Sequence, residues 1–318
     1  MSKESNNLGR AYEYACIVQL EKNISNVRKV EIIKNSSLLA SKKAWDNVDV
    51  SYHAIFMISA NAAVETLFEL EPLILEYDED VLELMLQRDT EGETGDVRDC
   101  VILRKGIEWE IGLSIKHNHF AVKHSRLAKN LDFGEKWFGL PCSKEYWDEV
   151  KPIFDYLEIE KSKKSKWREL PNKESDVYIP LLNAFLSEIR RNYDKHKQLP
   201  TKMVEYLLGG YDFYKVISVD SKKVTQIQPY NLHGMLNKRG KNQKSKIIVP
   251  IINLPTRIIS AEFKPKSGTT VELYFDEGWQ FGFRLHNAST FVETSLKFDV
   301  QIKGMPTSIM ILECNWER

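Results

Sequence analysis

The sequence has no long hydrophobic run, no paired cysteines and no excess of either charge. Its 318 residues include four cysteines, none of them in a Cys-x-x-Cys pair. This usage indicates reduced thiols rather than a disulfide framework or a zinc site. No apolar stretch approaches transmembrane length, and the first residues contain no apolar signal core. We therefore expect a cytoplasmic protein with no membrane partner.

The charge balance limits the partners that the chain is suited to. Lysine plus arginine and aspartate plus glutamate both total 45. A neutral chain is atypical of a protein that coats nucleic acid without specificity, although it does not exclude a charged groove. Apolar residues make up 42% of the chain, which is enough for a sizeable core. The length indicates two domains, or one domain with a large elaboration.

The most informative stretch is residues 95–119, where two apolar runs flank Lys105-Gly106. Alternating apolar runs on either side of a short turn predict a β-hairpin. With the turn centred there, paired residues have numbers that sum to about 212. Asp99 then lies opposite Ser114 or its immediate neighbour.

The same register brings a lysine to this end of the hairpin, because Lys116 lies one step further along the same face, beside Asp96. A carboxylate can hold a divalent cation that polarises a phosphate and activates water. A lysine beside it can orient that water or balance developing charge. The hairpin therefore favours phosphodiester hydrolysis, with Asp99 as a metal ligand.

An aspartate followed by a strand, with a lysine on the next strand, resembles the PD-(D/E)xK nuclease core. The wider sequence is more specific, and it resembles the HaeIII-type type II restriction endonucleases nearly from end to end. The segments that carry this resemblance are residues 9–13, 95–99, 112–127 and 283–299.

The resemblance implies a Mg²⁺-dependent enzyme that cuts both strands of double-stranded DNA at a short palindrome. It implies the target GGCC, cut in its centre to blunt ends with 5′-phosphates. A cognate DNA methyltransferase is then a functional, though not a physical, partner. Because a palindrome suits two-fold symmetry, we expect two subunits to act together. A monomer that cuts in sequential steps is the alternative.

One position departs from the family-wide core, which has a glutamate or aspartate two residues before the lysine. Ser114 occupies that position. Glu110 shares its face, but six residues separate it from Lys116, roughly 20 Å along a strand and too far to share a metal. We expect the missing ligand to be Asp96 or Glu13, which lies on a predicted N-terminal helix.

The predicted catalytic residues are therefore Asp99, Lys116 and Glu13, and the predicted metal ligands are Asp99, Glu13 and Asp96. An ordinary solvated helix position is the alternative for Glu13. Glu65, on another predicted helix, is a weaker candidate.

Residues 117–129 combine histidines with basic side chains. A zinc site of His117, His119 and His124 is disfavoured, because no cysteine accompanies them and the spacing is not that of structural zinc. We expect a helix that leaves the metal site and ends near residue 129, with basic side chains directed at DNA phosphates. A solvated helix face is the alternative. The side chains predicted to contact DNA here are Lys123, His124 and Arg126.

The C-terminal third is rich in predicted strands, which we expect to form an antiparallel sheet. The strands are predicted at residues 258–264, 270–275, 279–286, 296–302 and 308–313. A basic, exposed loop is predicted before them at residues 237–246. Because arginine and lysine pair with guanine in the major groove, this part is suited to reading G·C pairs. The predicted DNA contacts are Arg239, Lys241, Arg284, His286, Asn287 and Lys297.

These elements predict an α+β fold with a helix-covered mixed sheet. We expect a nuclease core at residues 1–140, a helical insertion at 141–210, and a β-rich region at 211–318 that completes the core and reads DNA. Ser114 motivates a second hypothesis, a catalytically inactive DNA-binding protein on a degraded nuclease scaffold. A non-specific repair nuclease is a third, which the large C-terminal part disfavours.

Overall fold

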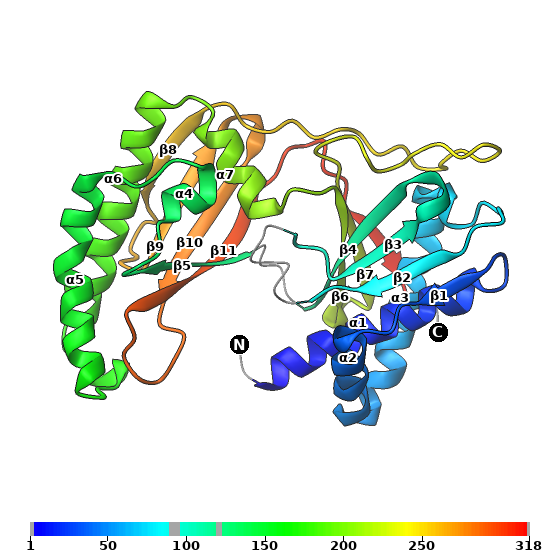
Figure 1. The fold of residues 1–318 in the computed structure, drawn as a ribbon, viewed down its shortest axis with the longest axis horizontal. Coiled ribbons are helices and arrows are strands. Elements are labelled where there is room, and N and C mark those ends of the chain that lie inside the picture. The colour runs from blue at the N-terminus through cyan, green and yellow to red at the C-terminus, as the bar shows by residue number, and fades with distance from the viewer. Residues whose placement is uncertain (1–2, 89–95, 119–122, 317–318) are drawn as a thin grey trace. The chain divides into compact units, whose positions relative to one another are not determined.

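The computed structural model describes residues 3–88, 96–118 and 123–316, and it divides into two compact units (Figure 1). Unit 1 contains Met1–Phe120, Gly209–Ile252 and Thr307–Arg318, and unit 2 contains Ala121–Leu208 and Asn253–Pro306. The chain therefore passes from unit 1 to unit 2 and back twice.

Unit 1 is built around a seven-stranded mixed sheet with the strand order β1-β2-β3-β4-β6-β7-β12. Its strands are β1 (Val30–Ile32), β2 (Leu82–Leu86), β3 (Cys100–Arg104), β4 (Trp109–His117), β6 (Phe213–Val219), β7 (Val224–Tyr230) and β12 (Leu312–Asn315). β1 pairs with β2 and β4 pairs with β6 in parallel, and the other neighbours are antiparallel. A parallel pair needs a long crossover, and the first segment of unit 2 lies within the β4–β6 crossover.

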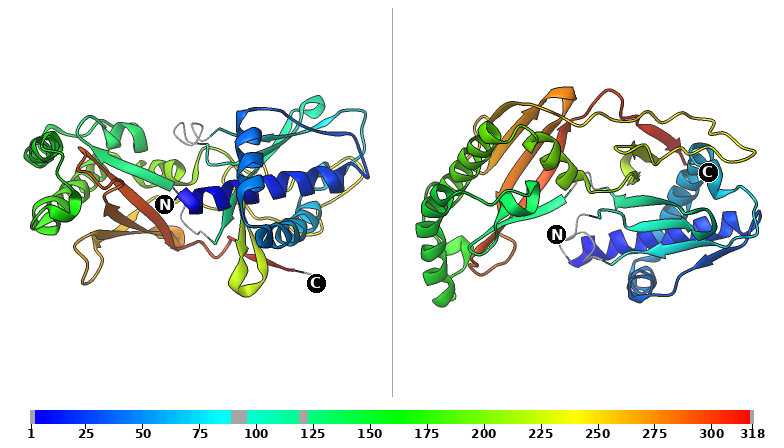
Figure 2. Two further views of the ribbon diagram at one scale, coloured as in Figure 1. Left: turned by 90° about the horizontal axis from the view of Figure 1, so that it is seen from below. Right: turned by 45° about the horizontal axis from the view of Figure 1, so that its top comes forward.

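Three helices lie along one side of this sheet, namely α1 (Lys3–Ile24), α2 (Ser36–Asn47) and α3 (Val50–Leu70) (Figures 1 and 2). Asn35 and Asp49 cap the N-termini of α2 and α3 with side-chain hydrogen bonds. The helices and the sheet share one apolar core. Its members include Tyr12, Ala15, Cys16, Phe56, Ala60, Cys100, Ile102, Leu113, Ile115, Tyr214 and Val216.

The predicted hairpin at Lys105 and Gly106 is confirmed. β3 and β4 are antiparallel, with Cys100 opposite Leu113, a register within one residue of the prediction. The turn is the 3-10 segment Lys105–Ile107. The apolar run at residues 213–219 forms β6, the parallel neighbour of β4.

Unit 2 combines a five-stranded antiparallel sheet with four helices. The strands, in sheet order, are β5 (Lys123–Ala128), β11 (Ser295–Gly304), β10 (Gln280–His286), β9 (Thr270–Phe275) and β8 (Ile258–Phe263). The helices are α4 (Phe133–Phe138), α5 (Lys144–Ser162), α6 (Ile179–Lys195) and α7 (Leu199–Leu208). One sheet face packs on the helices through aromatic rings, with Phe185 of α6 5.7 Å from Phe283 and 5.1 Å from Phe298 between ring centroids.

Two expectations about the fold need correction, and one strand was not expected. The helix expected after Lys116 is wrong, because residues 123–128 form β5. There Ser125 and Leu127 are buried while Arg126 is exposed, which is the two-residue alternation of a strand. The C-terminal strand β12 joins the sheet of unit 1 through β7 rather than the antiparallel sheet. β7 itself was not predicted, because its glutamines, threonine and proline interrupt the apolar alternation.

The predicted division into three consecutive parts also differs from the two observed units. Helices of the segment predicted as an insertion, residues 141–210, pack with β8–β11 in one unit. The overall α+β class is confirmed. Within the described residues no helix is long and apolar enough to cross a membrane.

Candidate active site

Asp99 extends β3 by one residue and is held between its two neighbouring strands. Its N–H donates to the carbonyl oxygen of Leu113 at 2.7 Å, and its carbonyl oxygen accepts from the N–H of Gln87 at 2.9 Å. Continuing the β3–β4 register by one residue sets Asp99 opposite Ser114. The backbone therefore directs the Asp99 side chain toward β4.

The Asp99 carboxylate meets three groups of β4. Lys116 Nζ donates to Asp99 Oδ2 at 2.8 Å, the N–H of Ile115 donates to the same oxygen at 2.6 Å, and Ser114 Oγ lies 3.5 Å away. The side chains of Lys116 and Asp99 are 26% and 24% exposed. The predicted convergence of this carboxylate and lysine is confirmed, and the pair is accessible to a ligand.

Glu13 lies in the same neighbourhood, on α1. Its Oε2 accepts a hydrogen bond from Ser41 Oγ at 3.2 Å. Burial raises the pKa of the Cys100 thiol, and the charges of Asp99 and Glu13 raise it further. Burial also raises the pKa of Cys16, on which both carboxylates again act. Glu13 and Asp99 therefore lie within electrostatic reach of the same two thiols.

Asp96 lies in a closed ion-pair cluster. Arg98 donates to both of its oxygens at 2.8–3.1 Å, and Gln87 Nε2 donates to Oδ2 at 2.8 Å. Arg98 also binds Glu110 at 2.8 Å. Burial opposes ionisation of Asp96, but these hydrogen bonds outweigh it and lower the pKa of the carboxyl. The contacts favour a structural role for Asp96, and they favour Glu13 as the second carboxylate.

Arg98 lies directly over the backbone of β4. A Cβ atom at Gly112 would be 1.9 Å from the Arg98 Cδ atom. Glycine is therefore required at this position for the close approach of the arginine side chain. This packing fixes the Asp96–Arg98–Glu110 cluster beside the Asp99 site.

The donor set of the site limits the metal ions that it can hold. Among the described residues, no group of three or more histidine, cysteine, aspartate or glutamate side chains could hold a metal ion. Mg²⁺ needs fewer protein ligands, because it is usually bound by one or two carboxylates together with waters and substrate phosphates. Asp99 and Glu13 supply hard oxygen ligands of that kind, so this pair fits Mg²⁺.

The predicted histidine cluster is only partly within the described residues. His117 Nε2 lies 2.7 Å from Asp220 Oδ2, and the ring packs against Phe56 with centroids 4.9 Å apart. These contacts give His117 a structural role on the helix-covered face. His119 and the side chain of His124 lie outside the described part of the chain.

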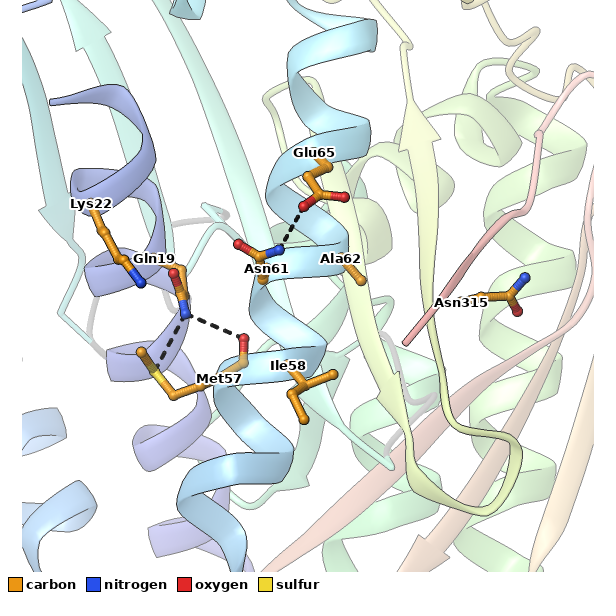
Figure 3. A pocket seen from close by; sticks show the side chains of 8 residues that line it. All are labelled: Gln19, Lys22, Met57, Ile58, Asn61, Ala62, Glu65 and Asn315. Carbon is orange, nitrogen blue, oxygen red and sulfur yellow. Dashed lines mark hydrogen bonds between the residues drawn. The ribbon is translucent and has the colours of Figure 1, made fainter. Parts of the chain in front are cut away.

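Glu65, the weaker glutamate candidate, lies elsewhere on unit 1. It is exposed and accepts a hydrogen bond from Asn61 Nδ2 at 2.6 Å. Both residues line a pocket with Gln19 and Lys22 (Figure 3). Neither Asp99 nor Lys116 lines this pocket, so the contacts of Glu65 give no support to it as a ligand.

Several predicted DNA contacts gather on one face of the unit 2 sheet. The register sets Arg126 of β5 opposite Lys297 of β11, and Lys297 opposite His286 of β10. Arg284 lies one row away on the same face, opposite Asp299. We call Arg126, Arg284, His286 and Lys297 the basic face. Partial burial lowers the pKa of Lys297, and the charge of Arg126 lowers it further.

Three other predicted DNA contacts, Asn287, Lys123 and His124, are not part of the basic face. Asn287 holds its own loop, because its Nδ2 donates to the Ser289 carbonyl at 2.9 Å and its Oδ1 accepts from Tyr178. Lys123 and His124 belong to β5 by their backbone pairing with Val300 and Asp299. Their side chains lie outside the described part of the structure.

The predicted basic loop is anchored to unit 1 at the turn end of the hairpin. Lys241 Nζ lies 3.2 Å from Asp78 Oδ2, and the N–H of Asn242 donates to Glu76 at 3.1 Å. Asp78 and Glu76 also contact Arg104, at the far end of β3 from Asp99. Five strand residues span roughly 17 Å, so Lys241 and the adjacent Arg239 belong to a different region from the Asp99 site.

Comparison with known proteins identifies the family. The model of the HaeIII restriction endonuclease family matches residues 9–306. The type II restriction enzyme HaeIII of Haemophilus aegyptius is 52% identical over 318 residues, which are the whole of both chains. The chain belongs to the HaeIII restriction endonuclease family. No solved structure matches it.

The sequence-based assignment to the HaeIII family is thus confirmed. The matched range of the HaeIII family includes Glu13, Asp99 and Lys116, as well as the basic face. This HaeIII-family chain has Ser114 where the PD-(D/E)xK core has a glutamate or aspartate. The serine is buried beside Asp99.

One residue of the site was not predicted. Lys215 of β6 lies opposite Ser114 of β4 and is 4% exposed. Burial and then the charge of Lys116 lower the pKa of Lys215 to about 7, against an opposing effect of Asp99. The available signal was a lysine within the apolar strand at residues 213–219. Its place next to the hairpin became evident only from the parallel β4–β6 pairing.

Proposed function

We propose that this HaeIII-family chain hydrolyses phosphodiester bonds of double-stranded DNA with Asp99, Glu13 and Lys116 as its active site. The observation that carries this proposal is the 2.8 Å contact between Lys116 Nζ and Asp99 Oδ2 at an accessible end of a β-hairpin. The HaeIII enzyme that is 52% identical to it is a type II restriction enzyme.

In this proposal the chain's own residues hold the metal and place the water. Asp99 and Glu13 would bind Mg²⁺. When bound, Mg²⁺ polarises the scissile phosphate and lowers the pKa of the attacking water. The N–H of Ile115 fixes the orientation of the Asp99 carboxylate. The Lys116 ammonium orients the attacking water and balances the negative charge that develops on the phosphate.

The arrangement supports a core of the PD-(D/E)xK kind. An aspartate at the start of β3 and a lysine on its antiparallel neighbour β4 are in contact, and a glutamate on α1 acts on the same two thiols as that aspartate. The alternative, an inactive DNA-binding protein, is motivated by Ser114. Glu13 favours the active enzyme, because it provides a second carboxylate without one at residue 114.

We further propose that the target is the palindrome GGCC, cut in its centre to blunt ends with 5′-phosphates, as the family resemblance implies. The basic face of unit 2 carries arginine, lysine and histidine donors suited to guanine edges and to phosphates. A palindromic target suits two copies of the chain related by a two-fold axis. A cognate DNA methyltransferase would protect the host sites.

The test is cleavage of a long duplex DNA with Mg²⁺ by the intact chain and by Lys116→Ala, with the fragment ends sequenced. We expect discrete fragments that end at GG/CC, and loss of cleavage in the variant. Lys105→Ala is a matched control, because Lys105 lies at the other end of the same hairpin and its side chain is 72% exposed. Binding without cleavage would support the inactive scaffold, and cleavage that survives Lys116→Ala would exclude this active site.

A further inference from the structure

Lys215 belongs to the same polar row of the sheet as the proposed active site. Asp99, Ser114 and Lys215 lie opposite one another on three neighbouring strands, because Asp99 extends β3 and β6 pairs with β4 in register. Residues that pair across strands project from the same face, with Cβ atoms about 5 Å apart. Lys116 projects from that face too, one step along β4.

A lysine at a buried strand position lowers the stability of the fold unless its charge is compensated. The other residues of β6 on this face are Phe213, Ile217 and Val219, which are apolar and buried. A buried ammonium group costs free energy unless anions or hydrogen bonds offset the loss of hydration. The charge of Asp99, the proposed metal ligand, favours the ammonium form of Lys215. Lys215 is therefore coupled electrostatically to the charged groups of the proposed site.

The identity of residue 114 explains why a second lysine suits this site. The family-wide core has a carboxylate at that position, and such a carboxylate would lie directly opposite Lys215. With Ser114 in its place, the site has two carboxylates, Asp99 and Glu13, and two lysines. Two carboxylates provide fewer metal ligands than three, so less of the positive charge at the phosphate comes from metal ions.

We propose that Lys215 is a second substrate-binding lysine of this active site, whose ammonium group binds the phosphate that is cut. It supplies positive charge that a third carboxylate with an additional metal ion would otherwise bring. This inference rests on the proposed function. A phosphate that reaches Asp99 and Lys116 comes within range of Lys215, because Lys215 lies opposite Ser114, which lies opposite Asp99 and one same-face step from Lys116.

The test is a double-substitution cycle on DNA binding, measured in metal-free buffer so that no cleavage occurs. The phosphate that wild type cuts is first located by sequencing fragment ends, and that phosphate is then replaced by an uncharged methylphosphonate. Wild type should bind the neutral duplex roughly tenfold more weakly, as expected for loss of a charged hydrogen bond. Lys215→Met should bind the normal duplex roughly tenfold more weakly, and its further loss on the methylphosphonate duplex should be smaller than the loss in wild type.

Two variants and a control distinguish loss of the Lys215 charge from loss of the folded structure. Lys215→Met keeps the length of the side chain, and Lys215→Gln keeps a polar group without the charge. Both are checked by thermal unfolding. Lys222→Met is the matched control, because Lys222 lies in the exposed turn that follows β6. It should show the same methylphosphonate penalty as wild type.

The outcomes separate this inference from the proposed function. Full additivity of the two losses in both Lys215 variants would overturn the role of Lys215. The same cycle with Lys116→Met tests the site as a whole. Coupling at Lys116 without coupling at Lys215 would leave the proposed function in place and reject only this inference. Absence of coupling at both lysines would reject the active site itself.

Discussion

The two ends of the β3–β4 hairpin both carry charged groups, but the protein satisfies them to different degrees. At the turn end, the Arg104 side chain is fully buried and binds Asp80 at 3.0 Å. Arg28 is also fully buried and binds the same carboxylate. At the other end, Asp99 and Lys116 are each about one quarter exposed. The comparison shows that one charge cluster is closed and structural, whereas the other is open to a ligand.

The closed cluster has the electrostatic properties of a permanent ion-pair network. Hydrogen bonds from Arg104 lower the pKa of Asp80, and burial only partly opposes them. Arg104 also donates to the carbonyl of Leu73 at 3.1 Å, which ties the hairpin turn to the segment after α3. Such contacts hold β2, β3 and β4 in place, so that the open end can keep its geometry.

The largest expected effect is on catalysis at the open end. Asp99→Asn should lower the cleavage rate by about 10³-fold or more, because it weakens a charged ligand at the reacting phosphate. The free energy of unfolding should change little, since the carboxylate is partly exposed. Single-turnover cleavage and urea unfolding of the same variant measure the two effects. A large loss of stability in Asp99→Asn would instead indicate that Asp99 has a structural role.

At the closed end we expect a large loss of stability with little effect on cleavage. Arg104→Met removes one partner of a buried ion-pair network and should lower the free energy of unfolding by about 3–5 kcal/mol. At a temperature where the variant is fully folded, its cleavage rate should match that of wild type. Urea unfolding followed by cleavage assays at low temperature checks this. A specific loss of cleavage in folded protein would contradict the division between the two ends.

The buried carboxyl of Glu71, which belongs to neither end of the hairpin, predicts that stability depends on pH. Glu71 accepts hydrogen bonds from Tyr214 Oη at 2.6 Å and from the Asn237 N–H. Burial raises the pKa of Glu71 to about 7 from 4.5. The unfolded chain loses this proton first as the pH rises, so stability should fall between pH 4.5 and 7.

Glu71→Gln removes that titration, and its stability relative to wild type should increase over the same pH interval by at most about 3 kcal/mol. Denaturant midpoints at several pH values for both proteins measure the difference. Parallel curves for wild type and variant would show that the carboxyl of Glu71 does not titrate in this range.

The smallest effect concerns DNA contacts in unit 2. Arg126→Ala should weaken DNA binding about equally for all sequences if Arg126 contacts a phosphate, and it should reduce the salt slope by about 1. Arg239→Ala, in the loop at the closed end, should leave the slope unchanged. Binding isotherms over a range of salt concentrations distinguish the two, and an equal effect of both would extend the DNA contact to that loop.

The hairpin was predictable because local rules determine it. Two apolar runs and a turn fix the register, and the register alone brings Asp99 and Lys116 together. The sequence after Lys116 favours a helix because Lys123, Arg126 and Lys129 fit one helix face. Tertiary pairing with β11, which lies far along the chain, decides in favour of a strand.

The rest of the site depends on distant pairings that no local pattern contains. The sequence leaves Asp96 and Glu13 equivalent as ligands, and the hydrogen bonds that Arg98 and Gln87 donate to Asp96 separate them. Lys215 joins the site because β4 and β6 are parallel neighbours across a crossover of nearly one hundred residues. The sequence shows that these residues are present, but only the order of the strands in the sheet shows that they lie close together.

We propose the open end of the hairpin, with Asp99 and Glu13, as the Mg²⁺ site. The most direct measurement is the Mg²⁺ concentration at half-maximal cleavage rate for Glu13→Gln and for Asp96→Asn, with unfolding midpoints of both. We predict that Glu13→Gln raises the Mg²⁺ requirement about tenfold or more with little loss of stability. Asp96→Asn should lower stability with the Mg²⁺ requirement unchanged. A raised Mg²⁺ requirement in Asp96→Asn, with none in Glu13→Gln, would contradict the assignment.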